Sequence, residues 1–145
     1  MDSKDQFDVQ GPYVYDGASR NLASRSGTHT IKVDQILSPA TGQRYYCSSP
    51  QQSVSGTATI TFTYVYQYRL SISIIGGLPG AQITDPPPGD YWYGSGSSVS
   101  VRAITCTEAV RFDHWELDGV NVGSQNPYTV TMNAPHNLVA VFVQT

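Results

Sequence analysis

The sequence predicts an all-β protein, and three observations lead to that prediction. Charged residues make up only 13% of the 145 residues, about half of the roughly 25% that is usual for soluble domains. Ten Tyr, thirteen Gly and many Ser and Thr take their place, and this composition favours strands and turns over helices. Residues 60–74 alternate between apolar or aromatic and mainly polar side chains, the period of a strand with one buried face.

The alternating run is unusually long. Its 15 residues contain no Gly or Pro, whereas the mean strand has about 5–6 residues. The run therefore predicts either one very long strand or two strands joined without a turn. It stops at Gly76 and Gly77. Two units that share this run would be joined without a flexible linker.

Similarities between the two sides of the run indicate an internal repeat. Strands are expected at residues 28–33, 44–47 and 57–64 in the first half. In the second half they are expected at 99–103, 111–115, 128–132 and 138–142, with a hairpin turn at Asp118-Gly119. Residues 16–25 are expected to form at most a short helical turn. We therefore expect two small antiparallel β units in tandem, sandwich- or grasp-like, sharing or joined by a long strand, with domains at 1–66 and 67–145.

The predicted core consists of the apolar residues that share one face of these strands. They are Ile31, Val33, Tyr45, Ile60, Phe62, Leu70, Ile72, Ile74, Val99, Val101, Phe112, Trp115, Val130, Leu138, Ala140 and Phe142.

Three motifs follow one another in the second half. Residues 93–101 read Y-G-S-G-S-S-V-S-V, residues 112–119 read F-D-H-W-E-L-D-G, and residues 128–142 read Y-T-V-T-M-N-A-P-H-N-L-V-A-V-F. In this order they resemble the divergent internalin-B-type repeat of bacterial and archaeal surface proteins, over about residues 68–143. Residues 27–68 look like a degenerate copy, with Ser48 where the Trp would align. The resemblance implies a small all-β module used in tandem as a stalk, spacer or adhesive array, with no catalytic residues to carry over.

Two groups of aromatic residues are candidate binding sites. Tyr91, Trp92 and Tyr93 would place two rings on one face of a strand and one on the other, so an exposed face would stack on a sugar ring. Tyr64, Tyr66 and Tyr68 form a stripe on the long run. That stripe either packs the junction between the units or forms an exposed ladder for a glycan or protein partner.

The remaining candidates have simpler explanations. Trp115 is expected in the core rather than in a sugar site, because Trp buries a large area. Asp113, Glu116 and Asp118 match no calcium loop, and His136 is expected to hydrogen-bond locally. Either Asp85 with Asp90, or Asp113 with Glu116, would suit acid–base chemistry only inside a deep pocket. We expect no cofactor, no metal site and no enzymatic activity.

Cysteine content and charge bear on the setting. Cys47 and Cys106 would form one disulfide in an oxidising compartment, and the alternative is two thiols. The N-terminus lacks the features of a signal peptide, yet only two Lys occur, which is typical of extracellular β modules. We therefore expect an internal or mature segment of an extracellular or cell-surface protein. The net charge of −3 does not indicate a basic surface that would bind nucleic acid. No apolar run approaches the ~20 residues of a membrane span.

These observations predict a non-catalytic structural or adhesive β module of a surface protein, stalk or filament. Its expected partners are other repeats or copies of itself, and in the filament version residues 5–15 would add a strand to a neighbour. The alternative is a carbohydrate-binding accessory module of a secreted hydrolase, which takes glycans as partners.

Overall fold

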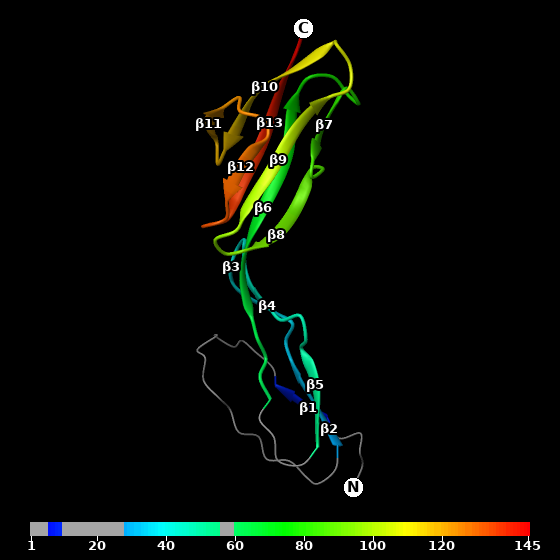
Figure 1. The fold of residues 1–145 in the computed structure, drawn as a ribbon, viewed down its shortest axis with the longest axis vertical. Helices are drawn as coiled ribbons and strands as arrows, with labels where there is room; N and C mark the ends of the chain where they lie inside the picture. The colour runs from blue at the N-terminus through cyan, green and yellow to red at the C-terminus, as the bar shows by residue number, and fades with distance from the viewer. Residues whose placement is uncertain (1–5, 10–27, 56–59) are drawn as a thin grey trace. The chain divides into compact units, whose positions relative to one another are not determined.

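The computed structural model describes residues 6–9, 28–55 and 60–145, and the described chain is all-β (Figure 1). No helix among these residues is long and apolar enough to cross a membrane. The contacts divide the chain into two compact units, Met1–Tyr66 and Gln67–Thr145. The division falls at the boundary expected from the sequence. That the first unit is a degenerate copy of the second stays a prediction.

The first unit contains two small groups of strands. Strand β2 (Thr28–Val33) lies between β1 (Gln6–Val9), which is parallel to it, and β5 (Gln51–Ser55), which is antiparallel. Strand β4 (Gln43–Tyr46) pairs with β3 (Ile36–Ala40) and, on its other side, with β6 (Val65–Gly76), whose first two residues belong to this unit.

Eight strands build the second unit, which begins within β6. One sheet has the order β11-β10-β13-β6, and β8 pairs with the other side of β6. A second sheet has the order β12-β9-β7. The bounds of the remaining strands are β7 (Gln82–Asp85), β8 (Gly89–Gly94), β9 (Ser98–Thr105), β10 (Val110–Leu117), β11 (Val120–Gly123), β12 (Tyr128–Thr131) and β13 (His136–Gln144).

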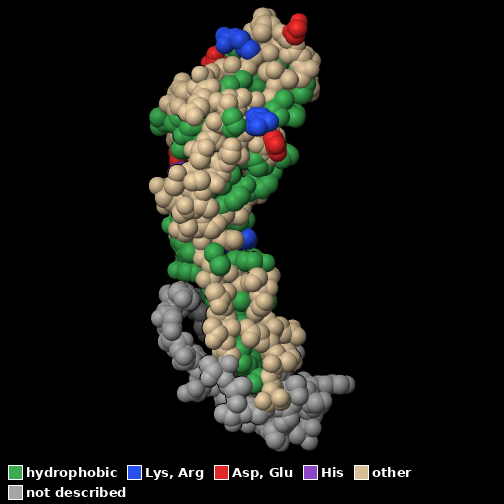
Figure 2. Space-filling model, in the orientation of Figure 1, with side chains coloured by type: hydrophobic (Ala, Val, Ile, Leu, Met, Phe, Trp, Pro, Cys, Tyr) green, Lys and Arg blue, Asp and Glu red, His purple; other side chains and the backbone are tan. Residues whose placement is uncertain are grey.

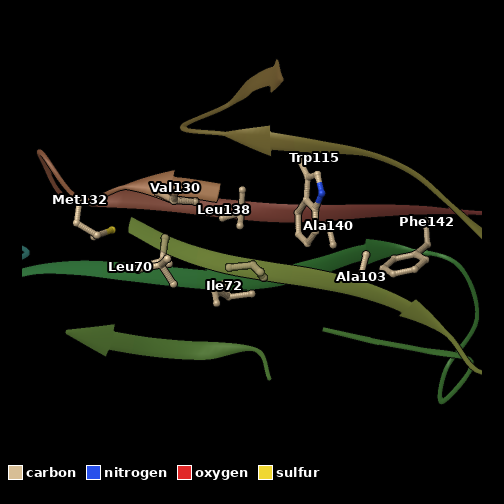
Figure 3. Packing of buried hydrophobic residues seen from close by; sticks show 11 residues of the cluster. Leu70, Ile72, Ala103, Trp115, Val130, Met132, Leu138, Ala140 and Phe142 are labelled. Carbon is tan, nitrogen blue, oxygen red and sulfur yellow. The ribbon is translucent and has the colours of Figure 1, made fainter. Parts of the chain in front are cut away.

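The core of the second unit lies between these two sheets (Figure 3). Side chains at every second position of β9 and β13 are buried, as the sequence period predicts. Trp115 of β10 is fully buried, and its ring centroid is 5.1 Å from that of Phe112. The buried members of this core are Leu70, Ile72, Val99, Val101, Ala103, Trp115, Val130, Met132, Leu138, Ala140 and Phe142.

The predicted core is close to the observed one but not identical. Six predicted positions are only half-buried: Val33, Tyr45, Ile60, Phe62, Ile74 and Phe112. Six further apolar residues of the described chain are buried although they were not predicted: Leu37, Cys47, Ala81, Ala103, Val110 and Met132. Cys47 and Met132 lie two positions after the predicted core residues Tyr45 and Val130, so the strand period places them on the same face.

The long run differs from its prediction at its beginning. The strand starts at Val65, and residues 60–64 belong to no strand, although Ile60, Phe62 and Tyr64 stay half-buried. The Gln52 side chain donates a hydrogen bond to the carbonyl of Thr61, at 2.8 Å. Alternation reports which side chains are buried, whereas a strand also needs a backbone partner.

Four strands were not predicted, namely β3, β5, β7 and β11. Pro39 is typical of a turn, yet it lies in β3, the last strand in the order of its sheet. An edge strand tolerates a residue without an N–H. Residues 16–25, with their expected helical turn, and residues 57–59 lie outside the described residues.

Candidate functional site

The three aromatic residues of β8 divide between two faces of the sheet. Strand β8 is antiparallel to β6, with Tyr91 opposite Leu70 and Tyr93 opposite Tyr68. Both tyrosine rings pack against the core, with their centroids 6.4 Å apart. Burial, with a smaller contribution from Tyr91, raises the pKa of Tyr93 above its ordinary value. These two rings therefore contribute to the core, and their predicted role in glycan binding stays a prediction.

Trp92 lies on the opposite face of β8, where it is half-buried opposite Arg69 of β6. On the same face the next pair is Ser71 opposite Asp90, and the Ser71 hydroxyl donates a hydrogen bond to the Asp90 carboxylate at 2.6 Å. We name these four residues the outer β6–β8 face. It places an indole beside a guanidinium, a hydroxyl and a carboxylate, which are groups that bind sugar hydroxyls and ring faces.

Sequence reasoning found Trp92 but missed its three neighbours on this face. The sequence spacing could have identified two pairs on this face, because Asp90 lies two residues from Trp92 and Arg69 lies two residues from Ser71. Residues two apart on a strand share a face. Only the register between β6 and β8 brings the two pairs together.

The predicted tyrosine stripe is distributed over both units. Tyr66 lies in the first unit, where its ring centroid is 4.7 Å from that of Tyr45 and its hydroxyl donates to the Gln43 side chain. Tyr64 donates its hydroxyl to the carbonyl of Asp34. Tyr68 belongs to the second unit and packs against its core. Each of these rings is half-buried within its own unit.

Trp115 has a structural role, as the sequence predicts. It is fully buried, and its indole N–H donates to the carbonyl of Gln125 at 3.0 Å. Its ring also lies near Tyr128, with centroids 6.4 Å apart. A buried indole with a satisfied N–H stabilises the core and presents no face to a sugar.

The Asp118-Gly119 turn is joined to the beginning of β13. Both residues have positive φ, 52° and 82°, the conformation of a two-residue hairpin turn between β10 and β11. Asp118 accepts a hydrogen bond from the backbone N–H of Asn137 at 2.8 Å. Its other carboxylate oxygen is 2.6 Å from Nδ1 of His136, whose Nε2 is 3.0 Å from the Asn133 side chain. The sequence predicted a local partner for His136 but not this distant one.

A second histidine lies between two carboxylates on β10. Nδ1 of His114 is 2.7 Å from Asp113, and Nε2 is 3.4 Å from Glu116. These interactions, that with Asp113 first, raise the pKa of His114. The same contact, helped by Arg111 at 3.1 Å, lowers the pKa of Asp113. Asp118 is engaged with His136, so the three carboxylates considered for calcium do not form one set.

No group of three or more His, Cys, Asp or Glu side chains in the described part of the chain is placed to hold a metal ion. Asp85 is exposed on β7 opposite Arg102, and Asp90 is engaged with Ser71. Asp85 and Asp90, which were considered as a pair for acid–base chemistry, therefore lie beside different residues, Arg102 and Ser71.

The two cysteines are free thiols. Cys47 is buried in the first unit, and Cys106 is exposed in the second. The two cysteines are not bonded to each other in the structure, and the disulfide considered from the sequence stays a prediction.

Comparison with protein-family models, curated proteins and solved structures finds no match for this chain. The resemblance of the second unit to internalin-B-type repeats therefore stays a prediction.

Proposed function

We propose that this chain is a non-catalytic structural module of an extracellular or cell-surface protein, used in a stalk or filament. One observation carries the proposal. The boundary between the units, Tyr66 to Gln67, falls inside the uninterrupted strand β6. Linkers between domains are usually flexible, polar segments, whereas here a strand serves as the connection. A connection that is itself a strand suits a structural protein whose units follow one another in tandem.

The surface of the second unit supports the same proposal. On the face in view in Figure 2, charged side chains are few and scattered. Several polar side chains of this unit are engaged within the fold, with Asp118 and His136 as one pair and Ser71 and Asp90 as another. Such groups hold turns and strands in register, which is the task of a structural module. The resemblance to internalin-B-type repeats adds to this proposal.

The location is tested by immunogold labelling of intact cells of the source organism. Antibodies raised against the purified chain are expected to label unpermeabilised cells. Labelling that appears only after permeabilisation would remove the proposal. Membrane-bound and secreted fractions of the same culture provide the matched control for antibody specificity.

The filament version has its own test. Strand β1 is the edge strand of its sheet and pairs parallel to β2, from Gln6 opposite Thr30 to Val9 opposite Val33. A four-residue edge strand is suited to exchange with a second copy by strand addition. Negative-stain imaging at rising protein concentration is expected to show filaments that are lost when residues 1–9 are deleted. Monodisperse particles at every concentration and temperature would exclude this version.

The outer β6–β8 face supports a second candidate function, glycan binding. Trp92, beside Arg69, Ser71 and Asp90, is the one aromatic residue of β8 that points away from the core. Removal of the indole by Trp92→Ala should abolish binding on a glycan array, because aromatic rings supply the stacking surface for sugars. Tyr91→Phe, which removes only the hydroxyl bonded to Pro87, serves as the control. Absence of any glycan signal for the unmodified protein would eliminate this candidate.

A further inference from the structure

The two strands at which the chain enters and leaves the second unit are direct neighbours. Strand β6 is the first of this unit and β13 is the last. They are parallel and paired without interruption from His136 opposite Leu70 to Phe142 opposite Gly76. The start of β6 and the end of β13 therefore lie at opposite ends of one ladder, as Figure 1 shows for the green and red strands of this unit.

This arrangement determines how a pulling force acts on the unit. A force along the chain draws β6 toward its beginning and β13 toward its end. Because the strands are parallel neighbours, the force acts along the ladder, and the hydrogen bonds between the two strands share the load. In a hairpin pulled at its open end, by contrast, the bonds break one after another. Forced unfolding is governed by the rate of crossing the unfolding barrier, and shared loading raises that barrier.

The core also resists sliding of β6 past β13. Leu70 and Ile72 on β6, and Leu138, Ala140 and Phe142 on β13, are almost fully buried in one cluster (Figure 3). A slip by one residue would turn these side chains to the outer face, because the side-chain period of a strand is two. A slip by two residues would move each of them into a space shaped for another, which a close-packed core opposes.

At the end of the ladder where Gly76 lies opposite Phe142, the backbones of β6 and β13 approach each other closely. Gly76 has φ +76°, and a Cβ atom at this position would lie 2.0 Å from the carbonyl oxygen of Phe142. At the C-terminus, the Thr145 N–H donates to the carbonyl of Ala109 at 3.0 Å. This hydrogen bond ties the residue after β13 to the residue before β10.

We propose that the second unit is a mechanical clamp, in which the parallel pair β6–β13 bears tension applied along the chain. The biological meaning of this clamp rests on the proposed structural function. The clamp itself is a property of the folded unit and is measurable without knowing where the protein acts.

Single-molecule force spectroscopy on the full chain tests the clamp by changing only the direction of pulling. Both proteins carry Cys47→Ala and Cys106→Ser and are held by the same N-terminal tag. In the first variant, called the shear protein, the second attachment point is the thiol of Thr145→Cys, and Asn133→Ser is added. In the peeling protein it is Asn133→Cys, in the loop before β13, so that both handles load the same end of the ladder. Substitution of Asn133 in both removes its contact with His136 equally.

The shear protein is expected to open the second unit at a several-fold higher force than the peeling protein at the same pulling speed. The shear event should release the 79 residues from Gln67 to Thr145, about 270 Å of extended chain less the length of the folded unit. The first unit is loaded in both proteins and serves as the internal reference. Should Asn133→Cys prevent folding, Ala134→Cys places the handle in the same loop.

Equal opening forces in the two directions, or no resolvable opening of the second unit in the shear protein, would overturn the clamp. Such a result would leave the proposed surface function standing, because that function is tested by cell labelling. Conversely, labelling only inside cells would remove the proposed function and leave a measured clamp intact.

Discussion

At the scale of single residues, His114 and Trp115 are neighbours on β10 with opposite roles. The imidazole of His114 lies between Asp113 and Glu116 on the outer face, with 19% of its side chain exposed. The indole of Trp115 is fully buried on the inner face. Strand alternation separates them, so one contributes electrostatic interactions that depend on pH and the other contributes packing.

The contact between His114 and Asp113 should make stability depend on pH. The pKa of His114 is raised in the folded state, so its contribution is complete below about pH 6.5 and is lost as the pH rises through the folded pKa. The pKa of Asp113 is lowered, so its contribution is present above about pH 4 and is lost as the pH falls further. The contact should therefore stabilise the fold most between these two values.

Thermal unfolding of a double-mutant cycle, with His114→Gln, Asp113→Asn and both together, measures this contact. The coupling is expected to be larger at pH 5.5 than at pH 8.5. A coupling that is the same at both values would contradict the assignment, and titration of the His114 ring by NMR provides the independent check of its pKa.

Replacement of the two tryptophans should have unequal effects on stability. Trp115→Ala removes a fully buried ring and leaves the Gln125 carbonyl without its donor, so we expect a loss of ~3–5 kcal/mol. Trp92→Ala removes a half-buried ring on the outer β6–β8 face and should lower the free energy of unfolding by clearly less than Trp115→Ala. Urea unfolding followed by far-UV circular dichroism compares the two. Similar losses for both variants would show that the outer face is packed as tightly as the core.

At the scale of elements, the ladder between β6 and β13 organises the second unit. The sequence period correctly predicted which side chains of both strands face the core. It did not predict that the two strands are parallel neighbours, because period and composition do not contain the partner of a strand. Several short polar strands, such as β7 and β11, also escaped prediction, since their hydrogen bonds come from the neighbouring strands β9 and β10.

Two glycines provide a matched test of the close approach at the end of the ladder. Gly76 and Gly80 have nearly the same φ, +76° and +74°, but only at Gly76 would a Cβ atom meet backbone, the Phe142 carbonyl. Gly80→Ala should cost ~1–2 kcal/mol for the left-handed conformation alone. Gly76→Ala should cost a further ~1–3 kcal/mol, because the ladder must shift. If both variants lose the same free energy of unfolding in urea, the backbone at the end of the β6–β13 ladder moves to accommodate the added Cβ atom.

At the scale of the whole molecule, the two units carry one cysteine each. Cys47 is buried, with 1% exposure, and Cys106 is exposed. Reactivity of a buried thiol reports opening of the structure around it. The natural cysteines therefore act as separate probes of the first and the second unit.

Labelling with a thiol reagent should proceed in two phases. Cys106 is expected to react at the rate of a free thiol, and Cys47 only as fast as the first unit opens. In denaturant without reductant, both should react at once. The variant Cys106→Ser should retain the slow phase alone. Detection of no free thiol in denaturant would instead reveal a disulfide between Cys47 and Cys106.

The sequence by itself determined the fold class, the inward face of most strands and the Asp118-Gly119 turn, because these depend on local period and backbone preference. Only the tertiary structure decided which strands pair, that Asp118 holds His136, and that Trp92 shares its face with Arg69 and Asp90. These contacts join residues far apart in the chain. Strand pairing and register bring such residues together, and a local pattern contains neither of them.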